Sequence, residues 1–347
     1  MKALENSIKR QIPQDILLDY IKLYKKVGVG EKYIDDLNVD FFVYNKLVQK
    51  DDIKYLFDMF FPTAKISETR FTSFVEKKAD LKPRNKDEIL LVNIRGIFDR
   101  IYSSNVFEVN TNEINDLAVL LYKGYLEKNN SFKKSSDSDH SSRDKLEEIV
   151  ASYNKLRKEK MVDYLCLNIA FLVDFLKLSP FKEGNSLVGI IVFYVLSLES
   201  DIKAFAYSSF FKKLFKYKDE YEKSVNESFF MYEDGFPNVS NLLRLMLKID
   251  KEAYDDLESL DRDYLFSKGL KKYDTVINII YKLGETFSKN DIREAIPGIS
   301  DSTIDRVLQD LQNEGKIGAY SKGRNAKWVL LDRSRDEKKN FLDEFKK

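Results

Sequence analysis

Residues 177–198 read KLSPFKEGNSLVGIIVFYVLSL, a short loop rich in Pro, Gly and Asn followed by a long apolar run. The residues before the loop, MVDYLCLNIAFLVDFLKL (161–178), are nearly as apolar, although four polar residues interrupt them. Helices that are apolar on almost all sides belong at the centre of a helical bundle. The interrupted run is shorter than the roughly 20 clean residues that a bilayer crossing needs, so we expect no membrane partner.

The loop itself has the features of an anion site. Gly184, Asn185 and Ser186 stand where the second helix is expected to begin. The first N–H groups of a helix are unpaired and carry a partial positive charge, which attracts phosphates and other anions. From spacing alone, however, an ordinary turn between two helices is the favoured interpretation.

The bulk composition limits the classes of partner. Lys and Arg number 58 against 57 Asp and Glu, so the whole chain of 347 residues has no strong field for nucleic acid or anionic lipid. A charged partner must therefore meet a local patch. The single cysteine excludes an internal disulfide framework, and the start MKALENSIKR lacks the pattern of a secretory signal, so we expect a cytoplasmic protein.

Helical spacing of apolar residues dominates the chain from about residue 8 to residue 160. Its clearest break is EKNNSFKKSSDSDHSSRD (127–144), a polar segment with almost nothing to bury, which predicts a mobile loop. Helices are expected to resume near Lys145 and to continue to about Leu260.

The pattern changes near Lys268. Three short helical segments are followed by IGAYSKGRNAKWVLL, which predicts two strands around a Lys-Gly-Arg-Asn turn. Ser300 is the expected N-cap of the third helix. Three helices followed by a hairpin describe a winged helix-turn-helix.

The loop resembles the signature of the Fic family, His-Pro-Phe-x-Asp/Glu-Gly-Asn-Gly-Arg. The corresponding residues here are Ser179, Pro180, Phe181, Lys182, Glu183, Gly184, Asn185, Ser186 and Leu187. Phe175 and the segment AYSSFFKKLFKYKDEYEKSV (206–225) are also similar to the family, and winged helices often follow Fic domains. The resemblance covers roughly residues 90 to 335.

The resemblance implies transfer of AMP from ATP to a protein hydroxyl, with the signature His as base. Ser179 stands in place of that His, and a neutral hydroxyl cannot accept a proton near pH 7 as an imidazole can. Glu183 retains the acidic position that would hold Mg²⁺, and Gly184 and Asn185 retain part of the phosphate cradle.

At other positions of the signature, this chain lacks the residues with which the family binds phosphate. Ser186 replaces the second Gly, while Leu187 and Ile190 replace the two Arg residues that would bind phosphate. The family's β-hairpin flap, which aligns the target chain, has no alternating strand to represent it. The only histidine, His140, lies in the polar 127–144 segment and is expected to be a solvated surface residue. AMP transfer by the usual mechanism is therefore not expected.

The segment SNVFEVN (104–110) resembles the family's inhibitory helix. Ser104 and Glu108 match its motif, but Val109 replaces the Gly or Asn that follows the Glu. In relatives this Glu restrains a signature Arg, and Leu187 leaves Glu108 without that partner. A surface carboxylate without a role is the alternative for Glu108.

The expected winged helix offers candidates for DNA contact. Helix 300–312 presents Ser302, Thr303 and Arg306 toward a groove, although its three Asp residues would repel phosphates. The wing carries Lys322, Arg324 and Lys327, which could bind phosphates. A protein-docking or dimerising domain is the alternative.

We therefore predict a mainly α protein with an N-terminal helical region (1–88), a degenerate Fic domain (89–262), a winged helix (268–333) and a charged tail (334–347). The favoured function is a cytoplasmic regulator or scaffold that binds DNA or a protein partner, and a homodimer is left open. The alternatives are a weak or altered nucleotidyltransferase and a nucleotide sensor. No cofactor is expected, and ATP and Mg²⁺ would bind only if residual Fic chemistry remains.

Overall fold

The computed structural model describes residues 1–9, 11–76, 81–103, 109–134, 141–269, 272–283, 286–320 and 327–331. Within these, the chain forms two compact units, Met1–Ser259 and Leu260–Lys347. Several residues singled out from the sequence lie outside the described residues: Ser104, Glu108, His140, Lys322 and Arg324.

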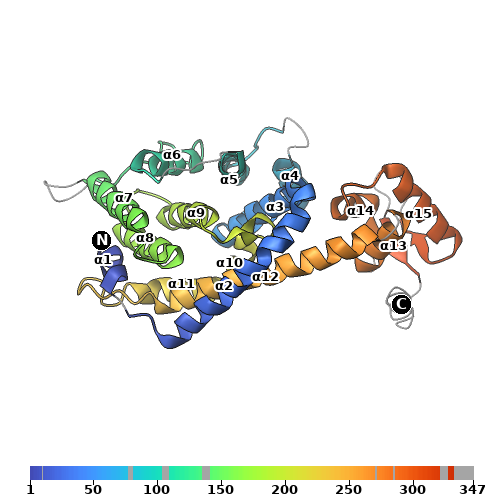
Figure 1. The fold of residues 1–347 in the computed structure, drawn as a ribbon. Coiled ribbons are helices and arrows are strands. Elements are labelled where there is room, and N and C mark those ends of the chain that lie inside the picture. Colours follow the sequence, from blue (N-terminus) through green and yellow to red (C-terminus); the bar gives the residue numbers. More distant parts are fainter. Residues whose placement is uncertain are drawn as a thin grey trace. The chain divides into compact units, whose positions relative to one another are not determined.

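The described part of the first unit is helical, which confirms the predicted fold class (Figure 1). Its helices are α1 (Lys2–Lys9), α2 (Gln14–Leu37), η1 (Asn38–Asp40), α3 (Phe41–Phe60), α4 (Glu68–Val75), α5 (Lys86–Ser103), α6 (Thr111–Leu121), α7 (Ser142–Glu159), α8 (Tyr164–Leu178), α9 (Asn185–Leu198), η2 (Lys203–Ala206), α10 (Phe210–Lys216), α11 (Lys218–Ser228) and α12 (Ser240–Gly269). The last of these helices, α12, was expected to end near Leu260, but it continues past Ser259 into the second unit and ends at Gly269. No described helix combines the length and the apolar composition that a membrane crossing needs.

Helices α8 and α9 form the centre of this unit and pack against each other, with α7 and α1 against α8 and α6 against α9 (Figure 1). Eleven residues of each are buried, on all sides of the helix. Burying a large aliphatic or aromatic side chain contributes roughly 1.5–3 kcal/mol, so these two helices supply much of the stabilisation of the fold. The structure places them where their apolar sequences predict.

The polar residue Asp174 of α8 has a structural purpose in this core. Its buried carboxylate accepts the backbone N–H groups of Ala3 (2.9 Å) and Leu4 (3.0 Å) at the start of α1. The Tyr232 hydroxyl donates a third hydrogen bond at 2.6 Å. Asp174 therefore binds the N-terminal helix to the centre of the unit, since a buried carboxylate is tolerated only with such donors.

Asp52 of α3 is a second buried carboxylate that joins several helices. It is fully buried and accepts hydrogen bonds from Tyr102 of α5 (3.1 Å), Tyr194 of α9 (2.8 Å), and Ser209 (2.5 Å) and the Phe211 N–H (3.0 Å) at the start of α10. Burial raises the pKa of Asp52 to about 6, although these donors act to lower it. No pattern in the amino-acid sequence indicated this junction.

The raised pKa of Asp52 predicts a pH-dependent stability. The difference between about 6 and the ordinary 3.8 corresponds to about 3 kcal/mol. Because the folded pKa is the higher one, this contribution is complete below pH 4 and is lost as the pH rises through 6. In urea unfolding, raising the pH from 4 to 7 should therefore lower the free energy of unfolding of the wild type relative to Asp52→Asn by most of that amount, about 2 kcal/mol. Parallel pH profiles for the two proteins would contradict this assignment.

The second unit contains α13 (Lys272–Lys282), β1 (Thr286–Ser288), α14 (Lys289–Ala295), α15 (Asp301–Asn313), β2 (Ile317–Ala319) and β3 (Lys327–Leu330). The three strands form an antiparallel sheet in the order β1-β3-β2. The three helices and the β2–β3 pair follow the order expected from the sequence, but β1 was not predicted. Its three residues are too few to give a recognisable alternating pattern.

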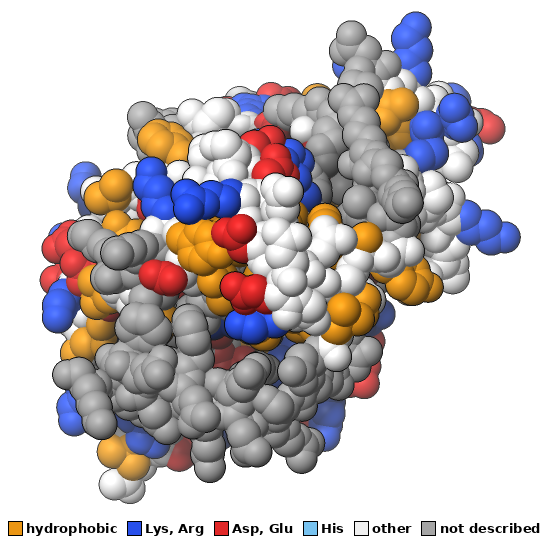
Figure 2. Space-filling model, turned by 90° about the vertical axis from the view of Figure 1, so that its right-hand side faces the viewer, with side chains coloured by type: hydrophobic (Ala, Val, Ile, Leu, Met, Phe, Trp, Pro, Cys, Tyr) orange, Lys and Arg blue, Asp and Glu red, His pale blue; other side chains and the backbone are white. Residues whose placement is uncertain are grey.

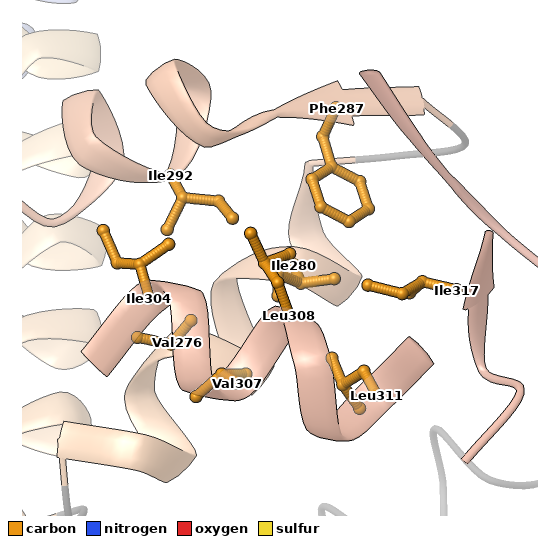
Figure 3. Packing of buried hydrophobic residues seen from close by; sticks show 9 residues of the cluster. All are labelled: Val276, Ile280, Phe287, Ile292, Ile304, Val307, Leu308, Leu311 and Ile317. Atoms are coloured by element: carbon orange, nitrogen blue, oxygen red, sulfur yellow. The ribbon is translucent and has the colours of Figure 1, made fainter. Parts of the chain in front are cut away.

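One apolar cluster holds the second unit together (Figure 3). Figure 3 shows α15 directing four side chains, Ile304, Val307, Leu308 and Leu311, toward Val276 and Ile280 of α13 and toward Phe287, Ile292 and Ile317. All nine side chains are buried. The apolar positions of α15 therefore belong to the core, and its polar positions remain for the surface.

Candidate functional site

The loop between α8 and α9 begins at Ser179, which ends α8 in a left-handed conformation (φ 48°, ψ 60°). Its N–H donates to the Phe175 carbonyl at 2.9 Å, and its hydroxyl donates to the Leu176 carbonyl at 3.1 Å. Both polar groups of this residue are thus used to close the last turn of α8. In this arrangement Ser179 acts as a helix cap.

Asn185, the first residue of α9, holds the loop closed. Its side-chain oxygen accepts the Phe181 N–H at 2.8 Å, and its side-chain nitrogen donates to the Phe181 carbonyl at 2.7 Å. Phe181 is fully buried, so both backbone groups would otherwise lack a partner. Asn185 therefore has a structural function that accounts for its presence.

Tyr122, next to the end of α6, covers the Gly184 position. Gly184 has φ 71°, and a Cβ built there would lie 2.2 Å from a ring carbon of Tyr122. The tyrosine is buried, and burial together with the negative charge of Glu183 raises the pKa of Tyr122 to about 12. Its ring thus lies directly against the glycine where the family cradle would receive a phosphate.

The segment before α7 also contacts this loop. The Lys133 N–H donates to the Pro180 carbonyl at 2.8 Å, and the Lys182 N–H donates to the Ser131 carbonyl at 3.0 Å. These bonds form an isolated antiparallel bridge between Phe132 and Phe181, whose rings lie 4.8 Å apart. The sequence prediction of a mobile loop over 127–144 is therefore wrong for its described beginning.

Asn130 strengthens the same contact from a buried position. Its side chain donates to the Glu183 carbonyl at 2.9 Å and accepts the Glu183 N–H at 3.3 Å. At the other end of the segment, Ser141 and Asp144 form a capping box and α7 begins at Ser142. The polar composition concealed these functions, because Asn, Ser and Asp are typical both of loops and of caps.

The start of α9 retains one feature of an anion site and lacks the others. The N–H groups of Asn185, Ser186 and Leu187 have no acceptor among the described residues. However, the side chains of Leu187 and Ile190 are buried in the core, 2% and 0% exposed, so apolar packing replaces the cations of the family pattern. A helix N-terminus without cations binds a triphosphate weakly.

Glu183 is exposed, and its backbone N–H and carbonyl bond to the Asn130 side chain. Its carboxylate makes no hydrogen bond to a described residue. The described residues contain no group of three or more His, Cys, Asp or Glu side chains placed to hold a metal ion. One carboxylate beside a buried tyrosine does not make a Mg²⁺–ATP site. The retained Glu183 therefore supplies at most one ligand.

In the second unit, the predicted DNA-contact residues lie on the exposed side of α15. Ser302 and Arg306 are exposed, Thr303 is half-buried, and Lys327 is exposed on β3. The Ser300 hydroxyl lies 3.0 Å from that of Ser302 and 2.9 Å from that of Thr303. The structure thus brings the three helix residues to one surface.

The acidic residues of α15 are paired within the unit. Arg293 of α14 binds Asp301 through two hydrogen bonds of 2.8 and 2.7 Å and holds the pKa of Asp301 below its usual value. Lys289 lies 2.5 Å from Asp305, and the Tyr273 hydroxyl donates to Asp310 at 2.8 Å. The two ion pairs therefore weaken the expected repulsion of phosphates at Asp301 and Asp305, whereas the neutral Tyr273 hydroxyl leaves the charge of Asp310 in place.

Figure 2 shows one face of the molecule, on which basic and acidic side chains are mixed at the left and centre, while basic side chains are more frequent at the right. This agrees with the pairing on α15 and with the balanced composition of the chain. A strong local field must then come from a few unpaired cations.

Comparison with known structures identifies the fold. The chain is similar to a Fic family protein from Desulfovibrio desulfuricans G20, with a TM-score of 0.54 and 13% identity over 94% of this chain and 98% of that chain. It is also similar to Fic-1 (residues 134–508) from C. elegans, with a TM-score of 0.51 and 10% identity over 70% and 73% of the two chains. No protein-family model and no curated protein matches the sequence. The chain has the Fic fold, which confirms the fold that the resemblance implied.

The structural function of Asn185 can be tested by mutation. Asn185→Ala removes both hydrogen bonds to the buried Phe181 backbone and should lower the free energy of unfolding by about 2–4 kcal/mol. Ser186→Ala changes the adjacent exposed residue and should alter it by less than about 0.5 kcal/mol. Urea unfolding measures both, and equal effects of the two substitutions would show that the amide does not hold the loop.

Proposed function

We propose that this Fic-fold protein does not transfer nucleotides and acts as a cytoplasmic regulator or scaffold. The observation that carries the proposal is the filling of the loop site: the Tyr122 ring lies against Gly184, and Leu187 points into the core. A phosphate at the start of α9 would meet an aromatic ring and no cation. The charged hydrogen bonds that would bind a nucleotide phosphate are thus missing at the position where the Fic family binds it.

The chemistry of the base supports the same proposal. The Ser179 hydroxyl donates to the Leu176 carbonyl, and the chain's single histidine, His140, belongs to another segment and lies outside the described residues. A serine is a poor general base at neutral pH without a second group to accept its proton. A weak or altered transferase would require a base from elsewhere.

The first test is catalytic. Incubation with labelled ATP, Mg²⁺ and a lysate should give no transfer above background for the wild type or for Ser179→His, because the phosphate clamp is a separate loss. The combined variant Ser179→His, Ser186→Gly, Leu187→Arg restores both the base and the phosphate clamp. Its new arginine replaces a side chain that is only 2% exposed, so the arginine must leave the core to reach a phosphate. Transfer by the wild type that Glu183→Ala abolishes would overturn the proposal.

We further propose that the second unit is a winged helix that binds DNA. Its order of helices and strands and the exposed Ser302 and Arg306 on α15 support this. Since the acidic groups of α15 are paired with Lys289, Arg293 and Tyr273, attraction to phosphates would come from the wing cations Lys322, Arg324 and Lys327. The helix would then supply discrimination and the wing affinity.

The wing cations and the helix should affect binding differently. Neutralising Lys322, Arg324 and Lys327 should weaken binding to all sequences and reduce the salt slope by roughly one unit per lost phosphate contact. Arg306→Ala should instead reduce discrimination between sites by roughly 1–3 kcal/mol, as expected for loss of a bidentate base contact. Fluorescence anisotropy at several salt concentrations, with fragments from around the gene, measures both effects.

Lys282→Ala is a matched control for that series, since Lys282 is already paired with Asp263 at 3.0 Å. It should leave both affinity and salt slope unchanged. Absence of binding at low salt, or binding that ignores the wing cations, would favour the alternative of a protein partner. The exposed Tyr320 and Leu331, 73% and 60% exposed beside the sheet, are the observation that favours this second candidate.

A further inference from the structure

The first unit contains a buried carboxylate that lacks the donors found at Asp52 and Asp174. Asp250 of α12 is 3% exposed, and its Oδ2 atom has no hydrogen-bond partner. Among the described residues, none forms an ion pair with it either. A buried acid in this state is costly unless it is protonated or a bound species supplies the missing interactions.

Asp250 lines a small cavity at the contact of α2, α8, α12 and the segment after α9. The cavity has a volume of about 10 Å³, enough for one water-sized species. Two apolar residues, Leu165 and Ile202, line it together with polar ones. The polar lining residues are Tyr24, Tyr164, Asn168, Ser197, Ser200, Asp201 and Asp250.

Negative charge gathers around this cavity without a counter-charge. Asp163 accepts the Tyr24 hydroxyl at 2.6 Å, and the charges of Asp163, Asp201 and Asp250, together with burial, raise the pKa of Tyr24. Burial and the charge of Asp163 likewise raise the pKa of Asp250. No Lys or Arg of the described residues forms an ion pair with any of these three carboxylates. The surroundings therefore favour a cation.

Two further buried hydroxyls, on the same helices α2 and α12, have no hydrogen-bond partner. The Tyr254 hydroxyl, one turn beyond Asp250 on α12, and the Tyr20 hydroxyl on α2 have no partner in the structure. Native proteins leave few such groups, and a cluster of them indicates a bound water or ion. The unsatisfied carboxylate of Asp250 is the strongest of these signals because it is charged.

We propose that this cavity binds one hard cation through oxygen ligands. The buried Asp250 and the exposed Asp201 would supply the carboxylates. Neutral oxygens of Asn168, Ser197 and Ser200 would complete the set through the lone pairs left by their hydrogen bonds to Tyr153, Phe193 and the Ser197 carbonyl. The described residues contain no group of three or more acidic, His or Cys side chains placed to hold a metal ion, so the site would have at most two carboxylate ligands. Carboxylate, amide and hydroxyl oxygens suit Na⁺, Ca²⁺ or Mg²⁺ better than soft metals.

The cation would join α8, α9 and α12 as Asp52 and Asp174 join their helices. The site is separate from the loop at residues 179–187, since none of its ligands belongs to that loop. It would therefore serve the structure of the first unit, whether or not that loop binds a nucleotide.

Thermal unfolding of the chelator-treated full chain tests the proposal. Separate titrations with CaCl₂, MgCl₂ and NaCl, each against choline chloride at equal ionic strength, distinguish the candidate ions. At one hundred times Kd, at least one ion should raise the Tm of the wild type by about 5 °C. Isothermal titration of the same sample should give about one site per chain if the proposal is correct.

Asp250→Asn keeps the shape of the side chain and removes its charge, so it should abolish this rise in Tm. Asp255→Asn, a change at an exposed carboxylate on the same helix, should retain it. An equal rise in Asp250→Asn would place the cation elsewhere and overturn the proposal. No rise with any of the three salts would also overturn it, and would leave a protonated Asp250 beside a water molecule.

Discussion

The paired hydrogen bonds between the Asn185 side chain and the Phe181 backbone close the turn between the two central helices. Because α8 and α9 are buried on all sides, the chain between them must satisfy its own polar groups within a few residues. Asn185 does this for Phe181, Ser179 caps α8, and Asn130 binds the backbone of Glu183. The loop can therefore be explained as a structural element, without reference to a ligand.

Buried carboxylates attach the outer helices to this centre. Asp174 binds the start of α1, and Asp52 joins α3 to α5, α9 and α10. Residues 1–88 accordingly pack within the same compact unit, Met1–Ser259, as the helices that follow them. A network of this kind is stable only when every member is satisfied, which makes the unpaired Asp250 informative.

Apolar periodicity predicted the central helices, the helices of the second unit and its β2–β3 pair, since these elements bury long regular stripes. The signature-like residues predicted the Fic fold, although no family model matches the sequence. The sequence did not reveal Tyr122 over Gly184, Asn130 on the loop or the partners of Asp52. Those contacts join residues that are distant in the chain. A single polar or aromatic residue forms no periodic pattern from which its contacts could be predicted.

The acidic residues of α15 show the same limit. Read in sequence, Asp301, Asp305 and Asp310 make the helix unsuited to DNA. In the structure, Arg293 and Lys289 come from α14 and Tyr273 from α13 to pair with them. Charge on a surface depends on neighbours that only the fold supplies.

Calorimetric titration of ATP into the full chain, with Mg²⁺ already present at saturation, tests most directly whether the loop still accepts a nucleotide. Prior saturation with Mg²⁺ excludes heat from binding of the ion alone. With Tyr122 against Gly184 and Leu187 in the core, we predict no saturable binding below about millimolar concentration, equivalent to about 4 kcal/mol of binding free energy. Micromolar binding that is lost in Glu183→Ala would contradict this account of the loop.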